Sequence, residues 1–86
     1  MELESKIQAK LIKKLEKEGY YVIKLISTNK NGIPDLVALP DNCGAIFIEV
    51  KQKGKKPEPL QKFRAKEIIN RGMKALGYDG EFFDII

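Results

Sequence analysis

Two carboxylates and one lysine stand close together in the sequence, around two short apolar segments. Asp35 closes a Gly-Ile-Pro-Asp turn, and Glu49 and Lys51 are two residues apart in the segment Ile-Glu-Val-Lys. Because side chains alternate across a β-strand with period two, Glu49 and Lys51 project from the same face of one strand. Residues 36–48 predict a strand, a turn and a second strand, and a hairpin of this length brings Asp35 level with Glu49. These side chains are suited to holding a divalent metal ion against a phosphate group.

Histidine is absent from the chain, and cysteine occurs once, as Cys43. The absence of histidine excludes Ser-His and Cys-His catalytic pairs and removes the most common general base. A structural zinc site is excluded as well, because such sites need several Cys or His ligands. We interpret Cys43 as a turn residue. Any catalysis by this chain must therefore depend on carboxylates, lysine and a metal ion.

The bulk composition predicts one small domain that covers residues 1–86. The chain has 86 residues, of which 43% are hydrophobic, so it can bury a modest core that dimerisation would help to stabilise. Its formal net charge of +4 suits a polyanionic partner. No apolar run is long enough to cross a bilayer, and the N-terminus lacks the basic and then apolar order of a signal peptide. We therefore expect a cytoplasmic protein with no membrane partner.

Hydrophobic periodicity and turn signals predict the elements that position the three side chains. The expected order is helix, strand, strand, strand, helix, strand, over residues 2–17, 20–26, 36–39, 45–51, 59–71 and 73–76. Gly19 and Gly72 are expected to end the two helices, and Pro59 suits the first position of the second one. The tail over residues 80–86 fits either a brief helix capped by Asp79 or a strand.

This order, with Asp35 and the Glu49-x-Lys51 pair on the central hairpin, resembles the PD-(D/E)XK nuclease superfamily, and within it the VRR-NUC (virus-type replication-repair nuclease) family. Four landmarks carry the resemblance across most of the chain: Glu4 with Gln8 four residues on, the Gly-x-Pro-Asp turn, the Glu-x-Lys strand and Gln61 at the start of the next helix. Four landmarks in one order are more specific than any one of them. The resemblance implies an α/β fold with a restriction-endonuclease-like core, a mixed β-sheet flanked by helices, in a stand-alone phage-like form.

The resemblance also implies hydrolysis of DNA phosphodiester bonds that leaves 5′-phosphate and 3′-hydroxyl ends. The carboxylates of Asp35 and Glu49, with the backbone carbonyl of Val50, would bind Mg²⁺ or Mn²⁺, which prefer oxygen ligands. The metal ion would polarise a phosphate oxygen and lower the pKa of a bound water. Lys51 would orient that water and stabilise negative charge on the phosphorane; a role as general base would require its neutral form.

Two further residues are expected to assist. Glu4 would supply another metal ligand or hold a metal-bound water, and the alternative is a solvated carboxylate in the first turn of a helix. Gln61 would hydrogen-bond Lys51 or a phosphate, and the alternative is an ordinary surface residue. Both belong to the predicted catalytic set with Asp35, Glu49 and Lys51.

The expected partner is branched DNA such as a Holliday junction, cut by a homodimer with two sites on one face. Lys30, Lys53, Lys55 and Lys56 are expected to contact DNA phosphates in a salt-dependent way, although lysines of this kind on most proteins serve solubility. A non-catalytic DNA-binding or assembly module is the alternative function, and the intact carboxylates and lysine argue against it. A restriction-type enzyme is a third alternative, but the chain has no room for a recognition domain.

Overall fold

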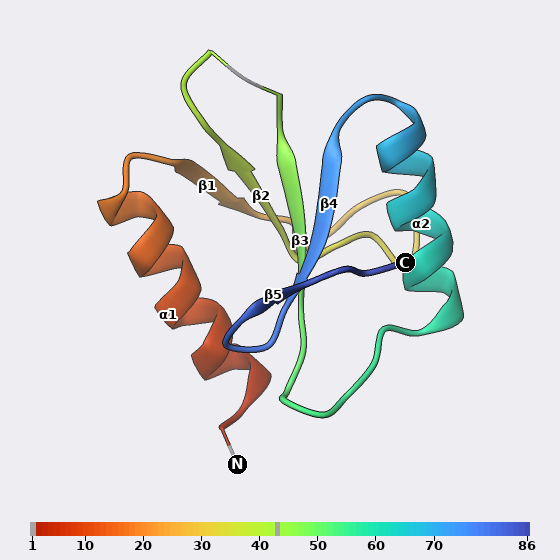
Figure 1. Ribbon diagram of the computed structural model, residues 1–86, viewed down its shortest axis with the longest axis horizontal. Coiled ribbons are helices and arrows are strands. Elements are labelled where there is room, and N and C mark those ends of the chain that lie inside the picture. The colour runs from red at the N-terminus through yellow and green to blue at the C-terminus, as the bar shows by residue number, and fades with distance from the viewer. Residues whose placement is uncertain (1, 43) are drawn as a thin grey trace.

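The computed structural model describes residues 2–42 and 44–86, in which one five-stranded sheet is flanked by two helices (Figure 1). The prediction for Cys43 falls outside these residues. The elements are α1 (Glu4–Lys17), β1 (Tyr21–Lys24), β2 (Leu36–Leu39), β3 (Ile46–Val50), α2 (Pro59–Asn70), β4 (Lys74–Tyr78) and β5 (Phe82–Phe83). The strands lie side by side in the order of their numbers. The predicted α/β class with a mixed sheet is confirmed.

The direction of each strand follows from the length of its connection. β1, β2 and β3 pair antiparallel, as consecutive strands joined by loops can. β3 and β4 pair parallel, because α2 carries the chain back to the end of the sheet at which β3 begins before β4 starts. β5 pairs antiparallel with the end of β4. The mixed sheet therefore arises from a single helical crossover.

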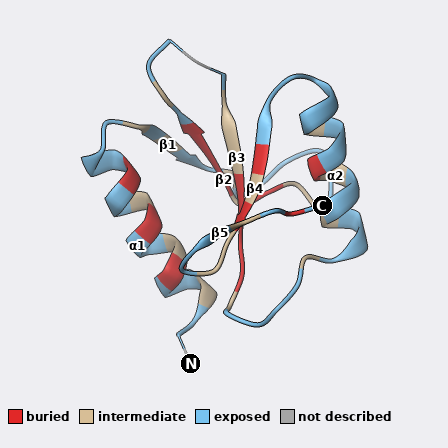
Figure 2. Cartoon of the chain, in the orientation of Figure 1, coloured by how far each residue is buried: buried red, intermediate tan, exposed pale blue. Residues whose placement is uncertain are grey.

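One face of the sheet is covered by α1. Its buried residues Ile7, Leu11 and Leu15 are spaced by four and form one apolar stripe, which Figure 2 shows along the helix. They pack in one cluster with buried residues of β2 and β3, namely Leu36, Ala38, Ile48 and Val50. Alternation along the strands then turns Glu49 to the opposite face of the sheet.

The opposite face is covered by α2, mainly over β4. Ala65 of α2, Ala75 of β4 and Ile85 of the tail form a second buried cluster, with Phe47 and Ile68 packed against it. This cluster is small, and α2 exposes most of its apolar residues, including Phe63 and Leu60. The apolar cluster therefore does not extend over the half of this face that carries Glu49, and polar side chains can be placed there.

The predicted element ends agree with the structure to within a few residues. Gly19 and Gly72 have positive φ angles of 97° and 89° directly after the two helices, a conformation that glycine adopts at little cost. Of the two alternatives for the tail, the helix is wrong and the strand is confirmed over two residues, because β5 forms there. Asp79 caps a turn, not a helix: its Oδ1 accepts a hydrogen bond from the Glu81 N–H. No helix in the described ranges is both long and apolar enough to cross a membrane.

The contact between Gly77 and Phe83 leads to a stability prediction. A Cβ atom added at Gly77 would lie 2.2 Å from two ring atoms of Phe83, so the ring occupies the space of a side chain at position 77. We expect Gly77→Ala to lower the free energy of unfolding by about 1–3 kcal/mol, the usual cost of overpacking. Denaturant unfolding at one pH measures this difference.

A double-mutant cycle provides the control for Gly77→Ala. In a Phe83→Leu background the alanine meets a smaller and more flexible side chain, so its cost should shrink. Costs that simply add in the double variant would contradict a steric clash between position 77 and the Phe83 ring.

Candidate active site

Asp35 is held by the backbone of both neighbouring strands. It immediately precedes β2, and its backbone oxygen accepts a hydrogen bond of 2.8 Å from the Leu25 N–H. Its side-chain Oδ2 accepts a second bond of 2.8 Å from the Val50 N–H of β3. The antiparallel register pairs Leu36 with Ile48, which places Asp35 beside Glu49 one step further along the ladder. The structure thus brings the two carboxylates together, as the hairpin argument expects.

Glu49 is the most deeply buried carboxylate in the described ranges, with 3% of its surface exposed. Its Oε2 accepts a hydrogen bond of 3.1 Å from the Gln61 side-chain amide, whereas its Oε1 is buried without a partner. Burial raises the pKa of Glu49 from 4.5 to about 8. Asp35 raises this pKa further, by its negative charge and as a hydrogen-bond partner for the protonated carboxyl group, and the charge of Glu4 adds to the effect. A buried carboxylate oxygen without a partner is costly and calls for a cation or a proton.

Lys51 follows β3 and is also buried, with 9% of its surface exposed. Its N–H donates a hydrogen bond of 2.9 Å to the Tyr78 backbone oxygen, which extends the pairing of β3 with β4 beyond Val50. The positive charge of Lys51 acts to lower the pKa of Glu49, but burial outweighs it. Asp35, Glu49 and Lys51 therefore form one partly desolvated cluster of two acidic groups and one basic group.

The remaining predicted catalytic residues reach this cluster from the helices. Glu4, in the first turn of α1, is partly buried and close enough for its charge to raise the pKa of Glu49. Gln61, in the first turn of α2, bonds to Glu49 and not to Lys51. The reason lies in the helix cap: the Glu58 N–H donates to Gln61 Oε1 at 2.7 Å, so the amide presents its NH₂ group, a donor that suits a carboxylate.

The chemistry of this cluster fits a small divalent cation. Between residues 2 and 42 and between 44 and 86, no group of three or more acidic or cysteine side chains is arranged to hold a metal ion. The pair Asp35 and Glu49 would supply two carboxylates to such an ion. Mg²⁺ is commonly bound by one or two carboxylates and keeps several waters. The unpartnered Oε1 of Glu49 is the atom that a cation would satisfy. The ligand roles of Asp35, Glu49, Glu4 and the Val50 carbonyl all stay predictions.

The capping arrangement gives a testable role to Gln61. Gln61→Ala removes its bonds to Glu49 and to the Glu58 N–H, and we expect a loss of about 1 kcal/mol in unfolding free energy. Because groups that orient metal ligands are typically worth 10- to 100-fold in activity, cleavage should fall by about that factor. Unfolding curves and cleavage rates on the same preparation measure the two effects.

Glu58→Ala is the matched control. The Glu58 side chain caps the same helix by accepting from the Gln61 backbone N–H, but it does not touch Glu49. We expect a similar loss of stability with cleavage nearly unchanged. Equal losses of activity in the two variants would mean that Gln61 matters only as a helix cap.

The predicted DNA-binding lysines lie outside the buried cluster. Lys30 is exposed in the loop between β1 and β2, and Lys53, Lys55 and Lys56 are exposed in the loop between β3 and α2. The two loops leave the sheet at the ends that carry Asp35 and Lys51. Their contact with DNA remains a prediction.

Three structural residues of the site are missing from the sequence prediction. Glu58 forms a capping box with Gln61, in which Glu takes the N-cap position that usually holds Ser or Thr, so the usual sequence signature is only partly present. Arg64 donates to the Asn31 backbone oxygen at 2.9 Å, which fixes the loop before Asp35 against α2. Gly77 pairs with Glu49 across β3 and β4. No local sequence signal predicts these last two contacts, because both join residues far apart in the chain.

Comparisons with known proteins agree on one family. Residues 2–79 match the family model described as the VRR-NUC domain. The chain is 34% identical over 79 residues to the protein called "Putative nuclease p44" of Acyrthosiphon pisum secondary endosymbiont phage 1, an alignment that covers 91% of this chain and 84% of the relative. A solved structure titled "VRR_NUC domain" superposes with a TM-score of 0.77 at 28% identity and covers 86% of this chain and 81% of its own.

Proposed function

Because the chain belongs to the VRR-NUC domain family, we propose that it is a metal-dependent DNA endonuclease that hydrolyses phosphodiester bonds at branched DNA. Nuclease activity follows from the family and from the phage relative, which is named as a nuclease. Dependence on Mg²⁺ or Mn²⁺ and selectivity for branched DNA are our own additions. The observation that supports metal dependence is the unpartnered Oε1 of Glu49 beside a second carboxylate and a buried lysine. Selectivity for branched DNA rests on the family resemblance alone.

The chain's own residues define the mechanism that we propose. Asp35 and Glu49 would hold the cation, which when bound supplies a Lewis acid for a phosphate oxygen and an acidified water. The Val50 N–H fixes Asp35, and Gln61 fixes Glu49, so neither carboxylate has to reorganise when substrate arrives. Lys51 places its ammonium group in the same buried cluster and stabilises negative charge that develops on the phosphate.

The test of this function is cleavage of a panel of end-labelled DNAs: a four-way junction, a flap and a linear duplex. Each is incubated with Mg²⁺, Mn²⁺ or EDTA and with wild type or Asp35→Asn, a substitution that keeps the shape of the side chain but removes its charge. We expect cutting with either cation, none with EDTA or Asp35→Asn, and the highest rate on the junction. Binding without cutting on every DNA would favour the non-catalytic module.

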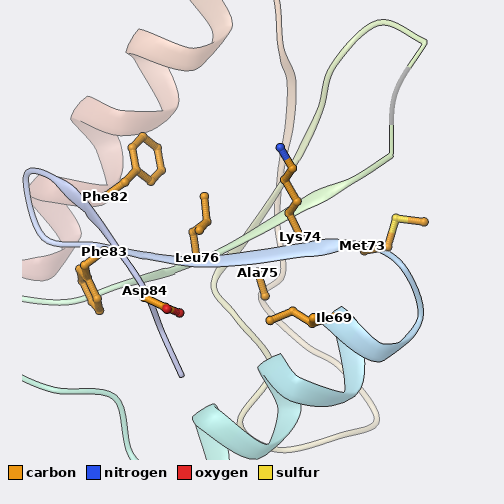
Figure 3. A pocket seen from close by; sticks show the side chains of 8 residues that line it. All are labelled: Ile69, Met73, Lys74, Ala75, Leu76, Phe82, Phe83 and Asp84. Atoms are coloured by element: carbon orange, nitrogen blue, oxygen red, sulfur yellow. The ribbon is translucent and has the colours of Figure 1, made fainter.

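A homodimer is part of the proposal, supported by an apolar surface along β4. β5 pairs with only the last two residues of β4, Gly77 and Tyr78. Beside residues 74–76 lies a depression of about 550 Å³, and Figure 3 shows the side chains that line it, including Ile69, Met73 and Phe82, each more than a third exposed. Exposed apolar surface next to an open strand edge is typical of an interface.

Replacement of exposed apolar side chains by lysine tests which edge of the sheet would form the dimer interface. We expect Ile69→Lys with Phe82→Lys to shift the protein from dimer to monomer in sedimentation equilibrium, because lysine is costly to bury at an interface core. Ile23→Lys, on exposed β1 at the opposite edge of the sheet, is the matched control and should leave the dimer intact. Dissociation by Ile23→Lys alone would place the interface on β1, and a monomeric wild type would exclude the dimer.

A further inference from the structure

A second cleft is lined in part by residues that closely follow those of the candidate active site in the sequence. It has a volume of about 340 Å³ and lies between the loop that follows β3, the first turns of α2 and the C-terminal residues. Lys55, Lys56 and Lys62 line one side, and the tail that contains Phe83 lines the other. Figure 1 shows how this is possible: after β5 the chain returns toward α2, above the loop that joins β3 to α2.

The lysines that line the cleft outnumber its acidic side chains by three to two. Lys55, Lys56 and Lys62 are exposed, and none of them forms a salt bridge within the described part of the chain. Two aspartates also line the cleft, but each has an oxygen engaged in a local turn: Asp79 accepts from the Glu81 N–H and Asp84 from the Ile86 N–H, both at 3.2 Å. Three lysines outside any salt bridge, against two aspartates that are engaged in local turns, leave one positive charge in excess and favour an anionic ligand.

The aromatic side of the cleft is held in place. The Phe83 ring lies over Gly77, where a Cβ would come within 2.2 Å of it. Two residues later Ile85, with 1% of its surface exposed, anchors the tail in the cluster formed with Ala65 and Ala75. A ring fixed before binding loses little conformational entropy when it contacts a ligand.

The position of the cleft relates it to the proposed reaction. Its basic loop begins directly after Lys51, and Lys62 is the residue after Gln61 on α2. The aromatic side connects to the same site through Gly77, which is the sheet partner of Glu49. A nucleic-acid strand with one phosphate at Glu49 would therefore pass the cleft with its neighbouring nucleotide.

We propose that this cleft binds one nucleotide of the substrate strand, adjacent to the phosphate that is cut. Lys55, Lys56 and Lys62 contact its phosphate, and the Phe83 ring contacts its base. Stacking of a base on an aromatic side chain is tolerant of sequence, so the cleft holds any of the four bases. This inference rests on the proposed function only in naming DNA as the source of the nucleotide.

The experiment is an NMR titration of the ¹⁵N-labelled protein in EDTA, which requires no cleavage. Thymidine monophosphate, thymidine and inorganic phosphate are added separately. We expect the monophosphate to shift amide signals of residues 54–56 and 79–84 and to bind at least fivefold more tightly than either of its two parts. Shifts elsewhere only, or phosphate binding as tightly as the nucleotide, would overturn the proposal.

Variants of the lysines separate the cleft from general charge. Lys55→Gln with Lys56→Gln should weaken the monophosphate at least fivefold, whereas Lys13→Gln with Lys17→Gln, an equal charge change at exposed positions of α1, should not. Equal weakening by both pairs would overturn the cleft. All four positions are exposed, so these variants should fold, and the spectra themselves verify it.

Cleavage measurements distinguish failure of the cleft from failure of the nuclease proposal. With DNA, the double variant Lys55→Gln with Lys56→Gln should have a higher KM and an unchanged kcat. The slope of log kcat/KM against log salt concentration should become shallower by about 0.7 for each phosphate contact to a single strand that is lost. If the cleft binds the nucleotide but the protein cuts no DNA, the proposal for the cleft holds and the proposed nuclease function is rejected. Cleavage with salt dependence unchanged in the variant would reject the cleft alone.

Discussion

Lys51→Ala is expected to reduce metal-dependent DNA cleavage by about 10²–10³-fold, the usual cost of removing one group that stabilises transition-state charge. Lys51 is buried in the same cluster as Asp35 and Glu49, and its charge acts directly on Glu49. Its removal takes away the cation that would oppose negative charge on the phosphate. The rate of junction cleavage at saturating Mg²⁺ measures the effect, because weakened metal binding is then compensated.

The control for Lys51→Ala is Lys53→Ala, the same change at an exposed position two residues further along. It should leave kcat nearly unchanged and affect mainly KM and its salt dependence. Circular dichroism and denaturant unfolding establish that both variants are folded. Unchanged cleavage by folded Lys51→Ala would remove Lys51 from the proposed mechanism.

Glu49→Gln is expected to stabilise the metal-free protein at high pH while it abolishes cleavage. The pKa of Glu49 is raised from 4.5 to about 8 in the folded state, so folding favours the protonated carboxyl. The stability that this group contributes is fully present below about pH 4.5 and is lost as the pH rises through about 8. Glutamine is neutral at every pH and lacks this loss, which for wild type is on the order of a few kcal/mol.

Unfolding free energies of both proteins between pH 5 and 9 in EDTA, at about one-unit steps, test this prediction. We expect the difference between variant and wild type to grow with pH, and Glu16→Gln, at an exposed position of α1, to show no such trend. A difference that is constant with pH would contradict a protonated Glu49 in the metal-free protein.

Addition of a divalent cation should reverse the order of stability. A cation bound by Asp35 and Glu49 favours the ionised carboxylates, so Mg²⁺ or Mn²⁺ should stabilise wild type at pH 8 to 9 by mass action, about 2.7 kcal/mol at a concentration of 100 times Kd. Glu49→Gln lacks one ligand and should gain much less. Equal stabilisation of both proteins would place the cation away from Glu49.

The sequence by itself determines which ionisable side chains come together in the site. Period-two alternation requires Glu49 and Lys51 to share a face, and the two strands with a short turn require Asp35 to return beside them. These are local constraints, because fewer than twenty residues separate the first from the last. The helix ends at Gly19 and Gly72 are predictable for the same reason, since positive φ is a property of one residue.

Only the tertiary structure decides the environment of that site. The hydrogen bond from Gln61 to Glu49 depends on how α2 crosses the sheet, and the sequence suggests Lys51 or a phosphate instead. The burial that raises the pKa of Glu49, and the Phe83 ring over Gly77, arise from strands and a tail that meet only after folding. Local patterns place ionisable groups on a face, but desolvation and long-range contacts, which set their charge and orientation, are properties of the packed chain.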